Sequence, residues 1–201
     1  MKYYEEEFYM NISLMSFSGR NKDGNCLRIL DYVNDHLDSK YNVTRLKTTE
    51  LIINQCLNCN YECFDAQLKC PKEQEDDVSF IYDNLIKSDI SIMAIPVYSA
   101  APPATYFALR ERSQSIFTNE AIEDGYNNTK KLYILIGNIQ AGALEAMAIL
   151  LSESKNSKKD DILLLESSVY GQKSTVGKLI EDKAVQDKIY DFLLEHKIEV
   201  I

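Results

Sequence analysis

Apolar runs alternate with amphipathic stretches along this chain. Short runs rich in apolar and β-branched residues predict strands at residues 12–17, 41–47, 90–95, 132–136 and 162–165. Between them, apolar residues recur at spacings of three and four and predict helices around residues 25–38, 78–86, 102–113, 144–151 and 185–193. Because strands alternate with helices, the pattern predicts a parallel sheet with helices on both faces.

The third and fourth predicted strands, residues 90–95 and 132–136, are almost wholly apolar, as expected of central strands covered on both faces. Five such strands suggest the doubly wound order 2-1-3-4-5, in a single domain over residues 1–201. In that architecture ligands bind outside the carboxyl ends of the strands, at the switch point. This places the site at three loops, residues 16–26, 96–102 and 137–142.

Three segments lack this regular pattern. Residues 1–8 are acidic and aromatic and are expected to form a frayed arm. Residues 48–72 show no periodicity and contain four cysteines, and residues 118–129 are polar and are interpreted as an inserted loop.

Four acidic residues lie just before the helix at 78–86 and are interpreted as helix-start charges, namely Glu73, Glu75, Asp76 and Asp77. In the helix after Gly142, the apolar residues Leu144, Met147 and Leu151 share one face.

Composition narrows the function classes. The 201 residues carry a formal net charge of -9 and only two histidines, His36 and His196, which disfavours a nucleic-acid partner and a histidine-built metal or triad site. No stretch reaches the roughly 18 to 20 uncharged apolar residues of a membrane span. We therefore expect a cytoplasmic protein with no membrane partner. Without a secretory signal, the five cysteines favour metal or redox chemistry over a disulfide framework.

The first of the three loops has the properties of an anion site. It joins a predicted strand to a predicted helix, and the free N–H groups and positive dipole end of a helix N-terminus attract anions. Hydroxyl, amide and guanidinium groups of Ser16, Ser18, Asn25 and Arg20 add donors suited to a phosphate. The loop matches neither the G-x-G-x-x-G pattern of dinucleotide-binding folds nor the Walker A pattern of nucleoside triphosphatases.

The contents of all three loops suit flavin mononucleotide (FMN). The polar loop accommodates its phosphate, the loop after Pro96 offers aromatic and small residues to its ring, and the loop after Gly137 lets backbone approach the ring edge. Flavin chemistry resides in the cofactor, so no catalytic acid or base is expected from the protein.

These residues resemble the NADPH-dependent FMN reductase and iron-sulfur flavoprotein group of the flavodoxin-like superfamily, from residue 12 to about residue 151. Ser18, Arg20, Gly24 and Asn25 resemble that family's Gly-Ser-Pro-Arg-x-x-Gly-Asn-Thr phosphate loop. Pro96-Val97-Tyr98 resembles its Pro-Val-Tyr flavin-ring loop, and Glu111-Arg112 its Asp-Arg pair at the end of the next helix. The chain departs from the family at Gly19, usually proline, at Cys26, usually threonine, and at Phe107, where many relatives have lysine.

The resemblance implies a flavodoxin-like fold and an oxidoreductase that takes a hydride from NADH or NADPH onto FMN and passes electrons to a second acceptor. Phosphate contacts are expected from the first loop, through Ser16, Ser18, Arg20, Gly24, Asn25 and Cys26. Ring contacts are expected from the second loop, through Pro96, Val97, Tyr98 and Ser99. Backbone or amide donors to the ring edge are expected from the third loop, through Gly137, Asn138, Gln140 and Gly142. The acceptor would be a small molecule or a redox protein, and the protein would be a homodimer or homotetramer.

The four-cysteine segment admits three interpretations. Its cysteines resemble the cysteine segment of cluster-binding relatives, but its spacing is Cys56-x2-Cys59-x3-Cys63-x6-Cys70, whereas those relatives have C-x2-C-x2-C-x4-7-C. Four thiolates can hold a [4Fe-4S] cluster, which tolerates varied spacing. They can also hold a structural zinc, although only one of the two usual C-x2-C pairs is present. In the third interpretation they bind no metal. The cluster would make the protein an iron-sulfur flavoprotein electron carrier, and loss of flavin would leave a flavin-free binding protein.

Overall fold

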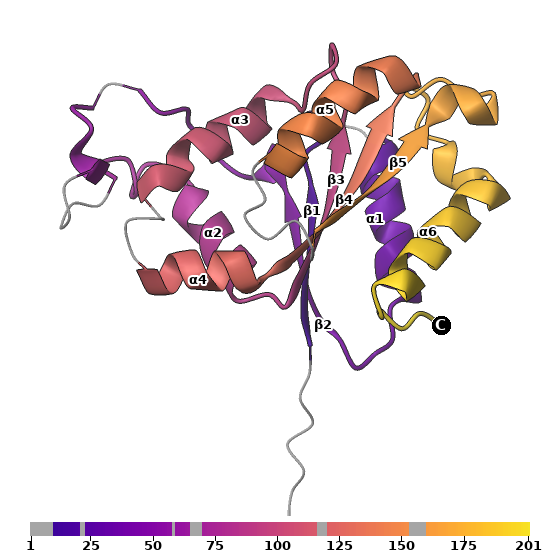
Figure 1. The fold of residues 1–201 in the computed structure, drawn as a ribbon, viewed down its shortest axis with the longest axis horizontal. Coiled ribbons are helices and arrows are strands. Elements are labelled where there is room, and N and C mark those ends of the chain that lie inside the picture. The colour runs from indigo at the N-terminus through magenta and orange to yellow at the C-terminus, as the bar shows by residue number, and fades with distance from the viewer. Residues whose placement is uncertain (1–9, 21–22, 58, 65–69, 116–119, 153–159) are drawn as a thin grey trace, which may run out of the picture.

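The computed structural model describes residues 10–20, 23–57, 59–64, 70–115, 120–152 and 160–201. Its centre is a five-stranded sheet of order β2-β1-β3-β4-β5, in which every neighbouring pair is parallel (Figure 1). The strands are β1 (Asn11–Ser16), β2 (Asn42–Lys47), β3 (Ile90–Pro96), β4 (Lys130–Gly137) and β5 (Asp161–Glu166). The predicted flavodoxin-like order 2-1-3-4-5 is confirmed.

Helices cover both faces of the sheet and divide the core into two halves. One half packs α1 (Asn25–His36) and α6 (Lys183–Glu195) against the sheet, and the other packs α2 (Val78–Ile86), α3 (Ala104–Glu111), α4 (Glu120–Asn128) and α5 (Gln140–Ser152) on the opposite face. Short 3-10 turns lie at Thr48–Glu50, Glu62–Phe64, Arg112–Ser115, Ser167–Tyr170 and Leu179–Glu181. No helix in the described part of the chain is both long and apolar enough to span a membrane.

The position of β3 determines where the loops meet. Every residue of β3 is buried, which explains why its sequence shows no alternation. β3 pairs with β1 on one side and β4 on the other, with Ala94 opposite both Ser16 and Ile134. The loops that follow β1 and β3 leave the same edge of the sheet in opposite directions, which creates the crevice at the switch point.

One expectation about the helices is wrong. The polar residues from 120 to 128 form α4 instead of an inserted loop, while residues 118 and 119 lie outside the described chain. α4 buries none of its side chains. Its contacts are to α2: the Thr129 hydroxyl donates to the Leu85 carbonyl over 2.8 Å, and a Cβ at Gly125 would lie 3.3 Å from Ile86. Tertiary contacts, which sequence periodicity does not report, thus hold this helix.

The face of α5 that carries Leu144 and Leu151 is not its buried face. The structure buries Ala143, Ala146 and Leu150, whereas Leu144 and Leu151 are 53% and 42% exposed. α5 is apolar around most of its circumference, so spacing alone does not identify its inner face. Small alanines let the helix lie close to the sheet. The predicted N-terminal arm and most of the charged connection before β5 lie outside the described residues.

The His196 ring at the end of α6 makes stability depend on pH. It packs edge-on against Phe192, and its Nε2 lies 3.3 Å from Asp161 Oδ2. Burial lowers the pKa of His196, Lys130 lowers it further, and Asp161 and Glu195 act in the opposite direction. The unfolded chain therefore binds a proton at His196 more readily than the folded chain does. The stabilisation that comes from the buried neutral ring is fully present above about pH 6.5 and is lost as the pH falls toward the folded pKa.

We expect His196→Gln to flatten the decrease in unfolding free energy between pH 7.5 and pH 5.5, measured by urea denaturation. His36→Gln is the matched control, because His36 is the chain's other histidine and also ends a helix. An equal decrease in His196→Gln and in the unmodified protein would contradict the expectation.

Candidate functional site

A pocket of about 340 Å³ opens at the carboxyl ends of β1 and β3. Its walls come from the loop after β1, the loop after β3, the end of β4 and a segment beyond β5; they are Ser18, Arg20, Gly24, Asn25, Cys26, Pro96, Val97, Tyr98, Ile136, Ser174 and Thr175. Eight of the fourteen residues predicted for the cofactor line it. The structure thus brings the first two predicted loops together.

One end of the pocket is built to receive an anion. α1 begins after Gly24, which Asp23 precedes; no described side chain caps it and its first turn has no acidic residue, so its free N–H groups are available to an anion. Arg20 lines the same end, and its side chain passes beside Gly24, where a Cβ would lie 3.5 Å from Arg20 Cδ. Ser18 adds a hydroxyl, while Ser16 is buried and accepts the Ser18 N–H over 3.4 Å. This end fits the phosphate of FMN.

The segment beyond β5 contributes Ser174 and Thr175, which the sequence patterns did not predict. Arg20 Nη1 donates to the Thr175 carbonyl over 2.7 Å, and Asn25 Nδ2 donates to the Ser174 carbonyl over 2.9 Å. Asn25 Oδ1 also accepts the buried N–H of Leu179 over 3.0 Å. The Asn25 amide, expected to contact phosphate, therefore joins α1 to this segment. The signal available in the sequence was a hydroxyl pair followed by a glycine after the last strand.

Gly177 explains why this segment lies so close to the first loop. Its φ of +79° lies in the left-handed region, which residues with a Cβ rarely adopt. A Cβ there would also lie 3.2 Å from the Asp23 carbonyl oxygen and 3.6 Å from Gly24 Cα. Glycine thus suits both the left-handed backbone conformation and the close approach to Asp23 and Gly24.

A tight turn forms the other end of the pocket. After Pro96 and Val97, Tyr98 exchanges backbone hydrogen bonds of 2.8 and 3.0 Å with Ala101. The two central residues, Ser99 and Ala100, have φ of +48° and +67°, an unfavourable conformation that is often found at functional sites in residues other than glycine. Ser99 occupies this turn and is not part of the pocket wall. Tyr98 is 47% exposed and forms the rim.

Burial determines the ionisation of the pocket's own groups. It raises the pKa of the Cys26 thiol to about 12, so Cys26 stays protonated and acts as a small apolar residue at the start of α1. The pKa of Tyr98 is raised chiefly by burial and next by Cys26, while Arg20 lowers it. Both groups are neutral near pH 7, and neither serves as a base.

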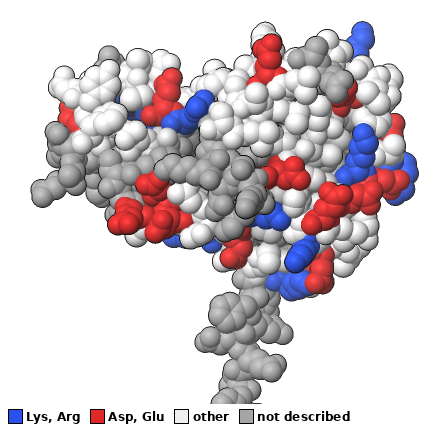
Figure 2. Space-filling model, viewed as in Figure 1, with Lys and Arg blue, Asp and Glu red and all other residues white. Residues whose placement is uncertain are grey.

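The third predicted loop lies beside the pocket. Ile136, just before it, is part of the wall, and a Cβ at Gly137 would lie 3.8 Å from Val97 Cγ2. Gly142 packs against Ala100, with 3.6 Å between its Cβ position and Ala100 Cα. The Asn138 side chain accepts the Ser167 hydroxyl over 3.2 Å, and the side chain of Gln140 lies outside the described atoms. Figure 2 shows a largely uncharged surface over α5. Ile139, just before α5, and Leu144 and Leu151 within it are exposed.

The four cysteines predicted as metal ligands lie away from the pocket, on the segment between Ile52 and Asp77, which we call the cysteine arm. Cys63 is buried and the others are partly exposed. Burial raises the pKa values of Cys56 and Cys63, and neighbouring thiols of the arm raise both further. Among the described side chains, however, no three His, Cys, Asp or Glu groups converge closely enough to hold a metal ion. The structure does not arrange these four thiols as a ligand set.

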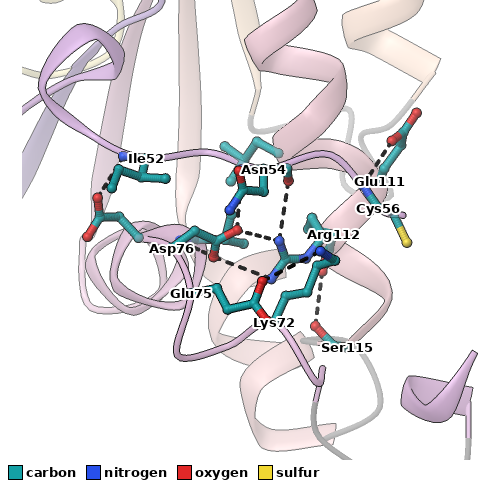
Figure 3. Close-up of polar contacts among 12 residues, drawn as sticks. Ile52, Asn54, Cys56, Lys72, Glu75, Asp76, Glu111, Arg112 and Ser115 are labelled. Atoms are coloured by element: carbon teal, nitrogen blue, oxygen red, sulfur yellow. Dashed lines mark hydrogen bonds and ion pairs between the residues drawn. The ribbon is translucent and has the colours of Figure 1, made fainter. Parts of the chain in front are cut away.

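A buried ion pair anchors this arm to the body (Figure 3). Arg112 donates to both carboxylate oxygens of Asp76, and these side chains are 2% and 0% exposed. Arg112 also donates to the Asn54 carbonyl, and the Asp76 carboxylate accepts the Asn54 N–H, each over 3.3 Å. Glu111 accepts the Cys56 N–H over 3.4 Å. Asp76, interpreted from sequence as a helix-start charge, is therefore the partner of a buried arginine.

The two ends of the arm also meet directly. The N–H of Ile52 donates to Asp77 Oδ2 over 2.7 Å, and the N–H of Asp77 donates to the Ile52 carbonyl over 2.8 Å. Residues 53–76 thus leave and return to the body at one place.

Solved structures with this fold include several flavin enzymes. An NAD(P)H:quinone oxidoreductase from Methanothermobacter marburgensis superposes with a TM-score of 0.66 at 11% identity, covering 91% of this chain and 92% of its own. The flavoenzyme NAD(P)H:acceptor oxidoreductase FerB from Paracoccus denitrificans gives 0.57 at 14% identity, with 96% and 100% covered. Smu.1420 from Streptococcus mutans UA159 gives 0.60 at 14% identity, with 94% and 100% covered. At these identities the likeness establishes the fold alone.

No curated protein sequence matches the chain. A family model described as NADPH-dependent FMN reductase matches residues 12–148, which include β1 to β4 and the first three loops of the site. The chain belongs to the NADPH-dependent FMN reductase family and is an NAD(P)H-dependent flavin oxidoreductase.

Proposed function

We propose that this protein holds FMN noncovalently in the pocket, reduces it with NADH or NADPH, and passes the electrons to a second acceptor. The observation that carries this proposal is the uncapped, positive N-terminus of α1, which lies with Arg20 at one end of a pocket whose other end is the strained turn after Pro96. This arrangement offers one polar, cationic end for a phosphate and one aromatic end for a ring.

The chain's own residues would bind and orient the cofactor. Ser18, Arg20 and the N–H groups at the start of α1 would hold the phosphate, and Val97 and Tyr98 would contact the ring. Bound FMN supplies the hydride-accepting chemistry. The protein supplies no acid or base there, since Cys26 and Tyr98 stay neutral.

The second acceptor would be a small molecule or a redox protein. Tyr98 and Ile139 are about half exposed, which leaves the ring end accessible from solvent. The nicotinamide that donates the hydride and the second electron acceptor would enter through this opening one after the other. The exposed apolar residues of α5 are compatible with the expected homodimer or homotetramer.

The iron-sulfur electron carrier is the second candidate. It is favoured by the mutual influence of the Cys56, Cys59, Cys63 and Cys70 thiols and by the anchored arm that carries them. It ranks below the reductase because the described thiols do not form a ligand set. The flavin-free binding protein ranks third.

The test is the ultraviolet-visible spectrum of protein purified without oxygen, with iron and zinc measured in the same sample. We expect two resolved flavin bands that bleach when NADH or NADPH is added, with no stoichiometric metal. A broad brown absorbance with about four irons per chain would make the electron carrier the correct function. Colourless protein that takes up no added FMN would contradict both and leave the flavin-free binding protein.

A further inference from the structure

We propose that the cavity enclosed by α2, α3 and α4 is a second binding site, which takes a neutral single-ring aromatic molecule. The cavity has a volume of about 210 Å³ and lies on the face of the sheet that these three helices cover (Figure 1). Among the described residues, it shares no lining residue with the pocket at the ends of β1 and β3. The inference is therefore independent of the proposed function, which concerns that other pocket.

The inner wall of the cavity is apolar and aromatic. It comes from the sheet, from α2 and from α3, and its residues are at most 6% exposed; they include Tyr82, Leu85, Met93, Tyr106, Leu109 and Tyr133. Tyr126 of α4 adds another aromatic ring from the partly buried side. Aromatic rings attract one another in edge-on and offset arrangements beyond what burial alone contributes. Such a wall suits the ring of an aromatic ligand.

The outer rim of the cavity is polar but its charges balance. Arg110 contributes a positive charge and Glu123 a negative one, while Ser113 and Asn127 are uncharged. An ionic ligand placed against the inner wall would lose its hydration without a compensating charge there. A neutral molecule, with its ring against the inner wall and a polar substituent near the rim, fits this distribution.

The cavity cannot close by a simple approach of its helices, because contacts beside it already fix them. α4 is joined to α2 by the 2.8 Å hydrogen bond from the Thr129 hydroxyl to the Leu85 carbonyl and by the close approach at Gly125. α2 is joined to α3 by a 3.1 Å hydrogen bond from the Tyr82 hydroxyl to the Leu109 carbonyl. These contacts hold the walls of the cavity apart.

The space between these walls has the size of a substituted benzene ring. An apolar cavity of about 150 Å³ in a protein core can stay dry and bind benzene. The present cavity, at about 210 Å³, leaves room for a small substituent as well. Because an empty apolar cavity lowers stability in proportion to its volume, a ligand that fills this one would be bound favourably.

Fluorine NMR with para-fluorophenol as the probe tests this site, and para-fluorobenzoate is the charged counterpart. We expect saturable broadening of the para-fluorophenol signal by the unmodified protein, and binding of para-fluorobenzoate that is weaker by about tenfold or more, because its charge would be desolvated. Leu85→Phe adds atoms to the inner wall and should weaken para-fluorophenol binding by about tenfold or more. Leu194→Phe is the matched control, because Leu194 is 45% exposed on α6, which packs on the opposite face of the sheet.

A second variant keeps the test decisive. Ser113→Phe obstructs the partly buried rim and gives the same comparison if Leu85→Phe fails to fold, as judged by circular dichroism. Absence of saturable binding to the unmodified protein would overturn the inference, and so would equal binding to the unmodified protein and to the folded variants. Equal affinity for the two probes would overturn the assignment to a neutral ligand.

The flavin separates this inference from the proposed function. Displacement of para-fluorophenol by added FMN would overturn the inference, because it would place the probe in the pocket at the ends of β1 and β3. Protein that binds para-fluorophenol but takes up no FMN would contradict the proposed function and leave the second site supported.

Discussion

Replacing Arg112 by methionine should lower the free energy of unfolding by about 3 to 5 kcal/mol, because it leaves the Asp76 carboxylate buried without its counter-charge. Both side chains are almost completely inaccessible to solvent. The Asn54 N–H and the Val78 N–H, each 3.3 Å from the carboxylate, are the backbone donors that remain for it. Urea denaturation of the apoprotein measures the change.

Two further variants make this prediction specific. Arg112→Met combined with Asp76→Leu removes both charges and should recover part of the lost stability, since replacing a whole buried pair by apolar groups is often neutral. Lys87→Met is the surface control, because its pair with Asp83 is long, at 3.8 Å, and its side chain is 75% exposed. It should change the unfolding free energy by less than about 1 kcal/mol. Equal losses in Arg112→Met and Lys87→Met would contradict the prediction.

Replacing Asn25 by alanine should lower the free energy of unfolding of the apoprotein by about 2 to 4 kcal/mol. The substitution leaves the buried Leu179 N–H and the Ser174 carbonyl without their partner, and an unpaired buried polar group costs about 1 to 3 kcal/mol. Using the apoprotein excludes the stabilisation that a bound flavin would add. The same variant should weaken FMN binding, because it releases the segment that contains Ser174 and Thr175.

Asn25→Asp replaces the donor to Ser174 by an acceptor. Aspartate retains the oxygen that accepts the Leu179 N–H but sets a carboxylate oxygen against the Ser174 carbonyl at a buried position, so it should destabilise at least as much as alanine. It also adds a negative charge beside the phosphate end and should weaken FMN binding at least as strongly. Asn34→Ala on the same helix is the control, since the Asn34 amide bonds only to its exposed neighbour Asp35 among the contacts described. A large loss in Asn34→Ala would show that the effect does not come from the contacts of Asn25.

The sheet and most helices were predictable because burial leaves a regular pattern in the sequence. The almost wholly apolar runs within β3 and β4 identified the central strands, and Val185, Ile189, Phe192 and Leu193 identified the buried face of α6. Strand order then placed the first and second loops at one pocket. These results follow from local periodicity and from the general topology of parallel sheets.

The errors arose where one segment depends on another distant in the chain. α4 is short and largely polar and packs on α2 and on the core through the partly buried Tyr126, so its own sequence gave only a weak signal for packing. Ser174 and Thr175 follow β5, at the far edge of the sheet from the switch point, and reach the pocket only because the chain returns to α1. Asp76 and Arg112 are 36 residues apart, and the sequence around each of them does not indicate that the two side chains are paired.

The two ends of the cysteine arm are hydrogen-bonded to each other, which affects how the sequence of the arm can evolve. Because Ile52 and Asp77 are hydrogen-bonded to each other, residues 53–76 form a detour that begins and ends at one point on the body. The entropic cost of closing a loop rises only slowly with its length. Insertions and deletions between Cys56 and Asp76 spare the contacts of Asn54 and Asp76 with Arg112 and would therefore leave the sheet and the pocket in place. The thiol-bearing part can thus diversify while the flavin site is retained.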